Sequence, residues 1–517
     1  YFLPLLLGLL GLFFQFDRDR RGCWLIFLMF FMTGIAIVIY LNQPPFQVRE
    51  RDYAYAGSFY FFSVWIGLAV AAITDWIRKG DDGKSKAVAA AVTVACLFVP
   101  ALMAARNWDD HDRSGRKTAA EIAGNYLNSV PRNGILITHG DNDTFPLWYA
   151  QEVENVRPDV RIVNTSLLGT DWHIDQMKYA VNESAPLPLT VGQEQYLYGT
   201  NDFIPIRDDD GEVKDIKDVM AVFRHPALKT SYGNSRVDYI NSRRIRIPVN
   251  KENVIRCGIL DERYADRIPD SIVFTMSPDK HMISKGELFL LDFLSNYQWD
   301  RPLCMLSMGG ELNVGQKEYL QYRGLSWMLV PIRSSSSTNS PGFADEVELH
   351  RLVNGEYKWD ALASDGYFID YQNNYTFLGV VGIRSVYHNC ATIVLKTGHP
   401  DWAAEALDVC MNSTRNYDLV TIPIGIATND YMMVQIISDY FLLGQDEKAG
   451  KLAEAYYGEL LPAIRFFVRY YALYKNESEM LLNCAGILAQ TMKENGRESF
   501  AEKVEKDLSE AISGLKN

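Results

Sequence analysis

The feature that most constrains this chain is a set of long apolar runs near its amino terminus. Three of them, at 23–41, 53–73 and 87–105, hold about 19 to 21 residues each. A helix of that length, rising about 1.5 Å per residue, crosses a hydrocarbon layer of roughly 30 Å. The runs also lack the polar face that a helix of a soluble domain would carry. They therefore predict three membrane-spanning helices.

A shorter apolar run opens the chain, from Tyr1 to Phe16. A natural protein begins with Met, and a signal peptide would carry a basic leader and a small-residue cleavage site. We therefore expect this run to be a truncated fourth span, and the chain to be the carboxyl-terminal part of a longer protein. Residues 1–105 would then be the last transmembrane helices of a larger α-helical membrane domain.

Basic residues in the links between these runs predict their orientation. The link after the first run holds Arg18, Arg20 and Arg21, the link after the third holds four Lys or Arg residues, and the link between them holds only Arg49 and Arg51. Links rich in Lys and Arg lie in the cytoplasm. The intervening link and everything after the fourth run should therefore lie outside, which for the inner membrane of a bacterium means the periplasm.

Charge and cysteine content exclude several classes of partner and site. The net charge is −13, yet residues 1–104 hold nine Lys or Arg against seven Asp or Glu, so the rest of the chain is strongly acidic. An acidic surface argues against nucleic acid as a partner. The seven cysteines form no CxxC pair, and no His lies at metal-ligand spacing from them. The sequence therefore signals neither a zinc site nor a disulfide framework.

From about residue 106 to residue 333, the chain alternates between strand-like and helix-like segments. NGILITHG and RPDVRIVNTSLL are predicted strands, and DNDTFPLWYAQEVENV between them is a predicted helix, which gives one βαβ unit. The pattern continues with DSIVFTM (strand), KGELFLLDFLSNYQ (helix), RPLCMLSM (strand), GQKEYLQYRG (helix) and LSWMLVPI (strand). We expect a Rossmann-like α/β sheet with a polar insertion at about 185–268 that forms a lobe or lid.

The carboxyl-terminal part is predicted to be helical. Residues 334–374, which include SSSSTNSPG, have the character of a linker and transition. Within 375–517, three Gly residues that each follow one apolar helical segment and precede another have an Ala five residues later, namely Gly398 with Ala403, Gly444 with Ala449, and Gly496 with Ala501. This pattern is typical of tetratricopeptide-like helical hairpins, although the Gly residues are more widely spaced than the usual period of about 34. An unrelated helical bundle is the alternative.

The charged loop between the second and third runs is a candidate phosphate-binding site. Arg49 and Arg51 follow the stiff pair Pro44 and Pro45 in QPPFQVRERDY. Two guanidinium groups at headgroup depth can hold a phosphate in bidentate fashion. The neighbouring carboxylates, Glu50 and Asp52, would orient or neutralise them. The alternative is a charged loop that anchors the chain at the membrane interface beside a belt of tyrosines.

A second candidate site follows the first predicted strand. His139, Asp141, Asn142 and Asp143 lie where that strand ends, and ligands of open α/β sheets bind at the carboxyl ends of strands. The DND triplet also has the form of a carboxylate pair that holds a divalent metal. We therefore consider acceptor or glycan binding, with a possible divalent metal. The alternative is that Asp141 or Asp143 caps the following helix while Asn142 shapes the turn.

Trp172 and His173, in GTDWHID, form a third candidate. An aromatic face beside a polar group suits the pyranose ring of a sugar. A packed pair whose hydrogen bonds are satisfied within the protein is the alternative.

Three longer segments resemble a known family. These are QPPFQVRERDYAYAGSFYFFSVWIGLAV, GDNDTFPLWYAQEVENVRPDVRIVNTSLL and YLQYRGLSWMLVPI. They are similar to large multi-pass membrane proteins of Bacteroidetes-type bacteria, which are related to the animal transmembrane O-mannosyltransferase that acts on plexin-type IPT domains. The resemblance extends over essentially the whole chain, and its most specific part is the PPxQxRERDY loop.

The resemblance implies a glycosyltransferase of the GT-C type. Such an enzyme would transfer a mannose-like sugar from a polyprenyl-phosphate donor in the membrane to Ser or Thr of exported proteins. It also implies that Arg49 and Arg51 bind the donor phosphate. The catalytic acidic residue of GT-C enzymes lies in the first outer loop, so we expect it upstream of Tyr1 and outside this chain.

Two other functions are compatible with the sequence. The chain could be a non-enzymatic, membrane-anchored scaffold whose sheet and helical repeats recruit periplasmic partners. Alternatively, the outer domain could itself be an enzyme built on His139, Asp141 and Asp143.

Overall fold

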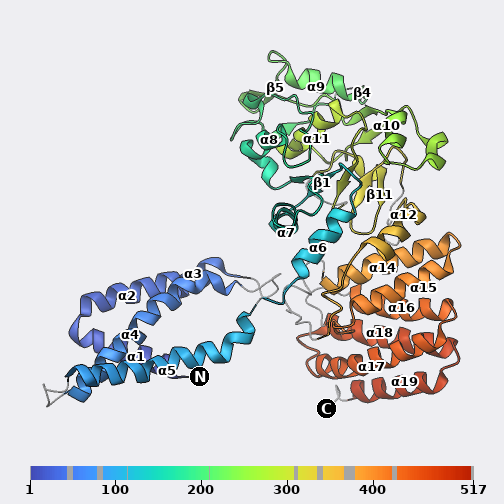
Figure 1. The fold of residues 1–517 in the computed structure, drawn as a ribbon. Coiled ribbons are helices and arrows are strands. Elements are labelled where there is room, and N and C mark those ends of the chain that lie inside the picture. Colours follow the sequence, from blue (N-terminus) through green and yellow to red (C-terminus); the bar gives the residue numbers. More distant parts are fainter. Residues whose placement is uncertain are drawn as a thin grey trace. The chain divides into compact units, whose positions relative to one another are not determined.

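The computed structural model describes residues 2–43, 51–78, 85–112, 114–208, 210–307, 312–334, 342–365, 379–421 and 428–513. The chain forms two compact units. The first contains the helices up to Arg116, and the second begins at Lys117. Each unit is described by itself (Figure 1).

The first unit is helical. Its elements are α1 (Leu3–Arg18), α2 (Arg20–Thr33), α3 (Ile35–Leu41), the 3-10 helix η1 (Asp52–Tyr55), α4 (Ala56–Arg78) and α5 (Ser85–His111). Three helical stretches, Arg20–Leu41, Asp52–Arg78 and Lys86–Trp108, are long and apolar enough to cross a membrane. This confirms the three predicted spans. The run that opens the chain forms α1, which at 16 residues is shorter than a span.

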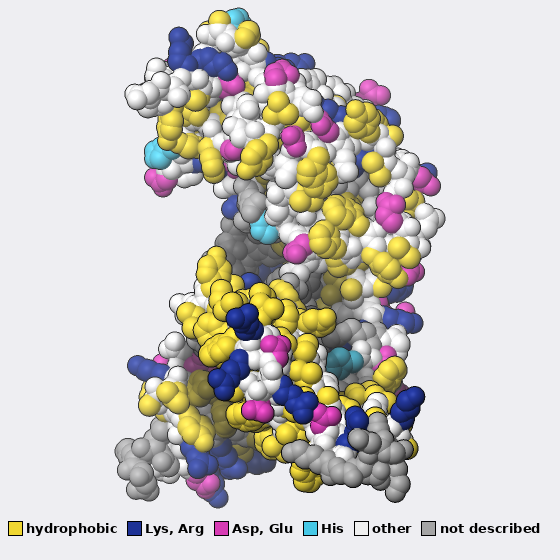
Figure 2. Space-filling view, turned by 90° about the vertical axis from the view of Figure 1, so that its left-hand side faces the viewer, with side chains coloured by type: hydrophobic (Ala, Val, Ile, Leu, Met, Phe, Trp, Pro, Cys, Tyr) yellow, Lys and Arg dark blue, Asp and Glu magenta, His cyan; other side chains and the backbone are white. Residues whose placement is uncertain are grey.

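Apolar side chains cover much of the outer surface of this unit, as the yellow atoms of Figure 2 show. Phe13, Trp24, Tyr40 and Phe98 are among the many large apolar residues that are more than half exposed. In water such a surface would be costly, because each exposed Å² of apolar area carries a penalty of roughly 25 cal/mol. A surrounding hydrocarbon phase removes that cost, in keeping with a membrane protein.

Small residues let α1 approach α4 closely. A Cβ built on Gly11 would lie 1.8 Å from the carbonyl oxygen of Trp65, and one built on Gly8 would lie 2.1 Å from the ring of Phe62. The Trp65 indole, which is buried, donates to Oε1 of Gln15 at 2.9 Å. Close backbone contact at glycines is a usual way for helices to associate in membranes.

An ion pair joins the carboxyl ends of α1 and α4. A guanidinium nitrogen of Arg18 lies 2.7 Å from a carboxylate oxygen of Asp75. The two helices therefore end on the same side of the unit, and so the two links that are rich in basic residues start from that side. The predicted membrane orientation, in which both basic links lie in the cytoplasm, requires that they start from the same side.

The second unit contains a five-stranded mixed sheet with the strand order β11-β12-β10-β1-β2. Strand β1 (Ile135–Thr138) is central and pairs in parallel with β2 (Arg161–Asn164) and β10 (Leu303–Met305). Its Leu136 lies opposite Cys304 on one side and Ile162 on the other. All three strands are fully buried, because helices cover both faces of a parallel sheet. The remaining strands, β12 (Trp327–Leu329) and β11 (Leu320–Tyr322), pair antiparallel.

Helices connect and cover these strands. They are α6 (Thr118–Asn128), α7 (Asp141–Glu152), α8 (Asp171–Met177) and α11 (Lys285–Asn296), with the 3-10 turns η3 (Leu167–Gly169) and η4 (Gln193–Gln195). Helix α11 begins with a capping box, in which Ser284 and Glu287 each accept the other's backbone N–H. Every residue from Lys285 to Ser295 is buried. This helix is therefore a core element, as its apolar sequence predicts.

One predicted helix is wrong. GQKEYLQYRG forms only a single 3-10 turn, η6 (Gln316–Tyr319), and then continues as the edge strand β11. The segment is short, and its antiparallel pairing with Trp327, Met328 and Leu329 of β12 decides its conformation. Tertiary pairing thus overrides the local helical preference of Gln, Lys and Glu.

The polar segment predicted as an insertion forms smaller sheets. Their strands are β3 (Phe203–Pro205) with β9 (Met282–Ser284), β4 (Val213–Asp215) with β7 (Arg244–Pro248) and β8 (Ser271–Thr275), and β5 (Thr230–Tyr232) with β6 (Ser235–Val237). Helices α9 (Ile216–Arg224), α10 (Lys251–Arg256) and η5 (Glu262–Arg267) accompany them. The predicted strand DSIVFTM is therefore part of the β4-β7-β8 sheet and does not extend the five-stranded sheet.

The rest of the unit is helical. Its elements are α12 (Glu346–His350), the π-helical turn η7 (Arg351–Glu356), α14 (Gly379–Lys396), α15 (Pro400–Ser413), α16 (Thr428–Leu442), α17 (Asp446–Arg469), α18 (Lys475–Glu494) and α19 (Glu498–Ser513). Helices α14 with α15, α16 with α17, and α18 with α19 pack as neighbours. The predicted turn residues Gly398, Gly444 and Gly496 all have positive φ. The Ala that follows each of them five residues later is buried.

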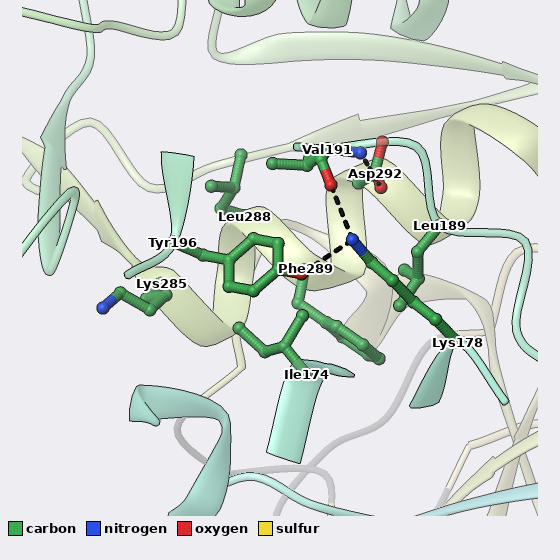
Figure 3. Close-up of a pocket in the computed structure, with 9 residues that line it drawn as sticks. All are labelled: Ile174, Lys178, Leu189, Val191, Tyr196, Lys285, Leu288, Phe289 and Asp292. Atoms are coloured by element: carbon green, nitrogen blue, oxygen red, sulfur yellow. Dashed lines mark hydrogen bonds between the residues drawn. The ribbon is translucent and has the colours of Figure 1, made fainter. Parts of the chain in front are cut away.

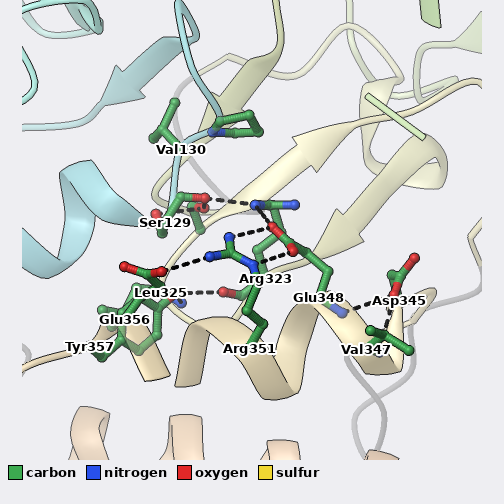
Figure 4. A network of polar contacts seen from close by, with 12 residues as sticks. Ser129, Val130, Arg323, Leu325, Asp345, Val347, Glu348, Arg351, Glu356 and Tyr357 are labelled. Carbon is green, nitrogen blue, oxygen red and sulfur yellow. Dashed lines mark hydrogen bonds and ion pairs between the residues drawn. The ribbon is translucent and has the colours of Figure 1, made fainter. Parts of the chain in front are cut away.

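Part of the stretch predicted as a linker is packed. The segment SSSSTNSPG lies almost wholly outside the described residues, but α12 and η7 bury Leu349, Leu352 and Val353. Arg323, near the end of β11, donates to the carbonyl of Ser129 at 2.9 Å and to Glu348 of α12 at 2.7 Å (Figure 4).

Helix α6 is hydrogen-bonded to the segment after η7. The side chain of Asn125 donates to the carbonyl of Lys358 and accepts its amide N–H, both at 2.8 Å. One turn earlier, the Glu121 carboxylate accepts the amides of Ala361 and Leu362. The beginning of the second unit thus holds the segment that leads into its carboxyl-terminal helices.

Candidate functional site

The carboxyl end of strand β1 is where an open α/β sheet of this kind offers a binding crevice. The chain continues from β1 to β2 on one side, while β10 lies on the other side of β1. Loops that leave such a strand in opposite directions open a gap at the sheet edge. His139 and Gly140 leave β1 there, and Thr165 leaves β2. The imidazole Nδ1 of His139, which is exposed, lies 3.3 Å from the Thr165 hydroxyl.

Asp143 caps helix α7. Its two carboxylate oxygens accept the backbone N–H groups of His139 and Gly140, each at 2.9 Å. A carboxylate at this position accepts hydrogen bonds from two backbone donors that have no acceptor within the helix. Its negative charge also interacts favourably with the positive end of the helix dipole. Both oxygens are therefore occupied, whereas Asp141 and Asn142 lie exposed on the first turn. Among the residues described, no three His, Cys, Asp or Glu side chains are placed to hold a metal ion.

Replacing Asp143 tests whether its carboxylate stabilises the start of α7. We expect Asp143→Ala to lower stability by about 1–2 kcal/mol, because two backbone donors lose their acceptor. Asp141→Ala removes a carboxylate from the same turn without a capping contact and should cost only a few tenths of a kcal/mol. Thermal unfolding of the two variants measures the difference. Equal destabilisation by both changes would contradict the capping role.

Asn164, at the end of β2, joins the two predicted clusters. Its side-chain Nδ2 donates to the carbonyl of Gly140 at 3.2 Å and to the hydroxyl of Thr144 at 2.8 Å. Its backbone N–H donates to Nε2 of His173 at 3.3 Å. The loop after β1 and helix α8 are therefore held together by one buried residue, through its side-chain and its backbone amide. The sequence analysis missed this residue, although a polar residue directly at the end of a buried strand was a usable signal.

His173 is buried and neutral, whereas Trp172 is half exposed. Burial lowers the pKa of His173 to about 4, and the nearby charge of Arg161 acts in the same direction. Because Nε2 accepts a hydrogen bond, the ring proton lies on Nδ1. The two rings touch edge to face with centroids 5.4 Å apart. Trp172 keeps 46% of its surface exposed. The histidine thus has the packed character of the alternative interpretation, while the indole remains available to a ligand.

Of the charged loop in the first unit, the structure describes Arg51 and Asp52 only. Both are exposed, at the start of the η1 and α4 helices. Arg49 and Glu50 lie outside the described residues. The predicted pairing of two guanidinium groups on one phosphate therefore remains a prediction.

A polar cluster in the core of the second unit is structural. Lys178 donates to the carbonyl of Val191 and to the hydroxyl of Tyr196, both at 2.8 Å, while Asp292 accepts the amides of Thr190 and Val191 (Figure 3). The cavity beside them has a volume of about 10 Å³. This is room for about one water molecule. The lysine and the aspartate therefore serve the packing of 187–196 against α11.

Comparison with known proteins relates the second unit to one family. Residues 119–348, from α6 into α12, match the family described as TMEM260-associated domain 2. A segment of 83 residues is 30% identical to the Protein O-mannosyl-transferase TMEM260 of Mus musculus. That match covers 16% of this chain and only 12% of the mouse protein. No solved structure matches the chain. The relation to the mouse transferase is therefore distant.

Proposed function

We propose that the chain is the carboxyl-terminal part of a membrane glycosyltransferase. In this proposal a mannose-like sugar passes from a polyprenyl-phosphate donor to Ser or Thr of exported proteins. The match of residues 119–348 to TMEM260-associated domain 2 carries the proposal, because the mouse TMEM260, to which part of the chain is similar, is a protein O-mannosyl-transferase. The three membrane-spanning helices support it, since a polyprenyl donor resides in the bilayer.

The parts of the chain take the following places in this proposal. Residues 1–105 are the end of a GT-C-like helical bundle, and 106–333 are a periplasmic Rossmann-like domain with its insertion at 185–268. Residues 334–374 lead into tetratricopeptide-like hairpins at 375–517. Three features support this division, namely the parallel βαβ core, the paired helices and the positive-φ glycines between them. Stacked hairpins present extended surfaces that suit the docking of acceptor proteins.

The chemistry needs a base and a stabilised leaving group. A base removes the proton of the acceptor hydroxyl while the C–O bond to the donor phosphate breaks. We assign the base to a carboxylate upstream of Tyr1. Arg49 and Arg51 stabilise the negative charge on the departing phosphate, with Glu50 and Asp52 as orienting partners. His139, Asp141, Asn142, Trp172 and His173 remain candidates for contact with the acceptor or its glycan, whereas Asp143 acts through the helix cap.

Replacing Arg51 tests the donor site. In the full-length protein we expect Arg51→Ala to lower the transfer rate about 10- to 100-fold, because the phosphate loses one charged donor. Arg78→Ala is the matched control, since Arg78 is equally exposed but ends α4 at its opposite end. The assay follows transfer of sugar from a polyprenyl-phosphate donor to a Ser- and Thr-containing peptide.

The outcomes distinguish the proposals. A normal rate in the Arg49→Ala, Arg51→Ala double variant would contradict donor binding by this loop. Failure of the unaltered full-length protein to transfer sugar, combined with capture of exported proteins, would instead support the non-enzymatic scaffold.

A further inference from the structure

A groove runs between α7, the outer edge of β2 and α8 in the second unit. It has a volume of about 450 Å³. Sites for small organic ligands usually measure roughly 300 to 1,000 Å³. The groove lies on the far side of β2 from β1, because β2 is the last strand of the sheet. It is therefore separate from His139 and Thr165, which follow the carboxyl ends of β1 and β2.

Aromatic side chains form the rim of this groove. Trp148 of α7 is held in place by stacking on Phe145, with ring centroids 5.4 Å apart and planes inclined by 27°. Trp172 of α8 is 46% exposed, and Tyr179, just after α8, is 69% exposed. Apolar groups that gather beside polar ones on a folded domain are typical of ligand-binding grooves, whereas single exposed rings are common. Their electron-rich faces attract the polarised C–H groups of a sugar ring.

The inner wall carries polar groups that the protein does not fully use. His173 is 1% exposed, and its Nδ1, which holds the ring proton, makes no hydrogen bond to any residue that the structure describes. The Gln176 amide is near enough to favour ring protonation, but the two groups do not meet hydrogen-bond geometry. A buried donor without an acceptor destabilises the folded state, because it has lost its hydrogen bond to water. A ligand or a water in the groove would remove that cost.

Arg161 lines the groove as a buried cation without a carboxylate. It is 3% exposed, and it donates to the carbonyls of Tyr179, Ser184 and Ala185 and to the Ser184 hydroxyl. No Asp or Glu within the described ranges pairs with it. The other charged residue of the wall is Glu152, which accepts the Asn182 amide at 2.8 Å. Because the lining contains one positive and one negative side chain, the groove carries no net charge.

This combination points to a neutral ligand with many hydroxyl groups. Gln176, together with the polar atoms of Asn182 and Glu152 that lie outside their mutual hydrogen bond, can bind hydroxyl groups of a ligand. A phosphate would find one guanidinium, whose Nε and Nη2 already donate to Tyr179, Ser184 and Ala185. A peptide adding to the edge of β2 would find the amide of Asn164 already bonded to His173.

We propose that the groove between α7, β2 and α8 binds a neutral hexose-containing saccharide, stacked on Trp172 and Tyr179. The choice of a hexose rests on the proposed function, whereas the presence of a saccharide site rests on the groove itself. The saccharide is either free or attached to an acceptor protein.

The test measures binding to the full-length protein in detergent, without any polyprenyl donor. The probes are a fluorescent mannose disaccharide, a peptide carrying one O-linked mannose and the same peptide without sugar. Tyr179→Ala and Trp172→Ala should each weaken saccharide binding at least about tenfold, as loss of roughly 1.4 kcal/mol of stacking requires. Tyr198→Ala is the matched control, because Tyr198 is 88% exposed and does not line the groove. Unchanged unfolding temperatures show that the variants fold.

Each result is informative. Binding of both sugar-bearing probes supports a free or attached saccharide, and binding of the glycopeptide alone assigns the site to glycosylated acceptors. Equal binding of the unmodified peptide, equal binding by all variants, or no saccharide binding at millimolar concentration would overturn the proposal. Arg51→Ala should leave binding unchanged, so loss of transfer with intact saccharide binding separates the two proposals.

Discussion

A single methyl group added at Gly11 should destabilise the membrane helices by about 3 kcal/mol, whereas the same group added at Gly67 should not. The Cβ of Gly11→Ala would lie 1.8 Å from the Trp65 carbonyl oxygen and 2.7 Å from its carbon. Both atoms belong to the backbone, so α1 and α4 would have to separate. Their separation would also break the bond from the Trp65 indole to Gln15.

Gly67→Ala is the control, because nothing lies within 4 Å of a Cβ at that position. Alanine favours helix over glycine by up to about 1 kcal/mol, so this variant should be neutral or slightly more stable. The measurement is the unfolding temperature of the full chain in detergent micelles, followed by circular dichroism. If Gly11→Ala unfolded at or above the temperature of Gly67→Ala, the close approach of α1 and α4 would be refuted.

The second large effect concerns Asp430 in α16, which is completely buried. Burial raises the pKa of its carboxyl to about 7, although the positive charge of Arg384 opposes the rise and Glu459 adds to it. In the unfolded chain the same group has a pKa of about 3.9. Between these values the folded state binds the proton more strongly. Stability should therefore fall as the pH rises from about 4 to about 7 and change little above that range.

Asp430→Asn removes this titration. Relative to the variant, the unaltered protein should lose about 2–3 kcal/mol of stability between pH 5 and pH 8. Unfolding by urea at the two pH values measures the loss, and Asp439→Asn, at a partly exposed carboxylate of the same helix, is the control. Parallel pH dependence of the unaltered protein and Asp430→Asn would show that Asp430 is not a protonated core group.

The sequence predicted those elements whose signal is local. Long apolar runs marked the membrane helices, and short apolar runs next to helical patterns marked β1, β2, β10 and α11. Gly398 and its two counterparts marked the turns between paired helices. The helix predicted around Tyr319 was wrong, because residues 320–322 form a strand through their pairing with β12. The sheet that β8 joins is likewise decided by its pairing with β7, some 25 residues away in the chain. No local pattern specifies that pairing.

The candidate sites show the same division. Position after a strand was enough to place His139 and Asp143 at the sheet edge, but not to show that both oxygens of Asp143 face backbone amides. The capping role depends on the angle at which the chain leaves β1. Asn164 escaped notice because its partners, Gly140 and His173, come from separate elements. The groove beside Asn164 is lined by residues of α7, β2 and α8. The sequence does not specify that these three elements lie next to one another.

The bonds from Glu121 and Asn125 to residues 358–362 determine where a water-soluble fragment for crystallography has to begin. A start after Asn128 would delete the acceptors of three backbone amides, those of Lys358, Ala361 and Leu362. A start just before Thr118 keeps these acceptors while omitting the three helical stretches that are long and apolar enough to cross a membrane. A fragment that starts just before Thr118 should therefore give a higher yield and a more monodisperse protein than one that starts after Asn128.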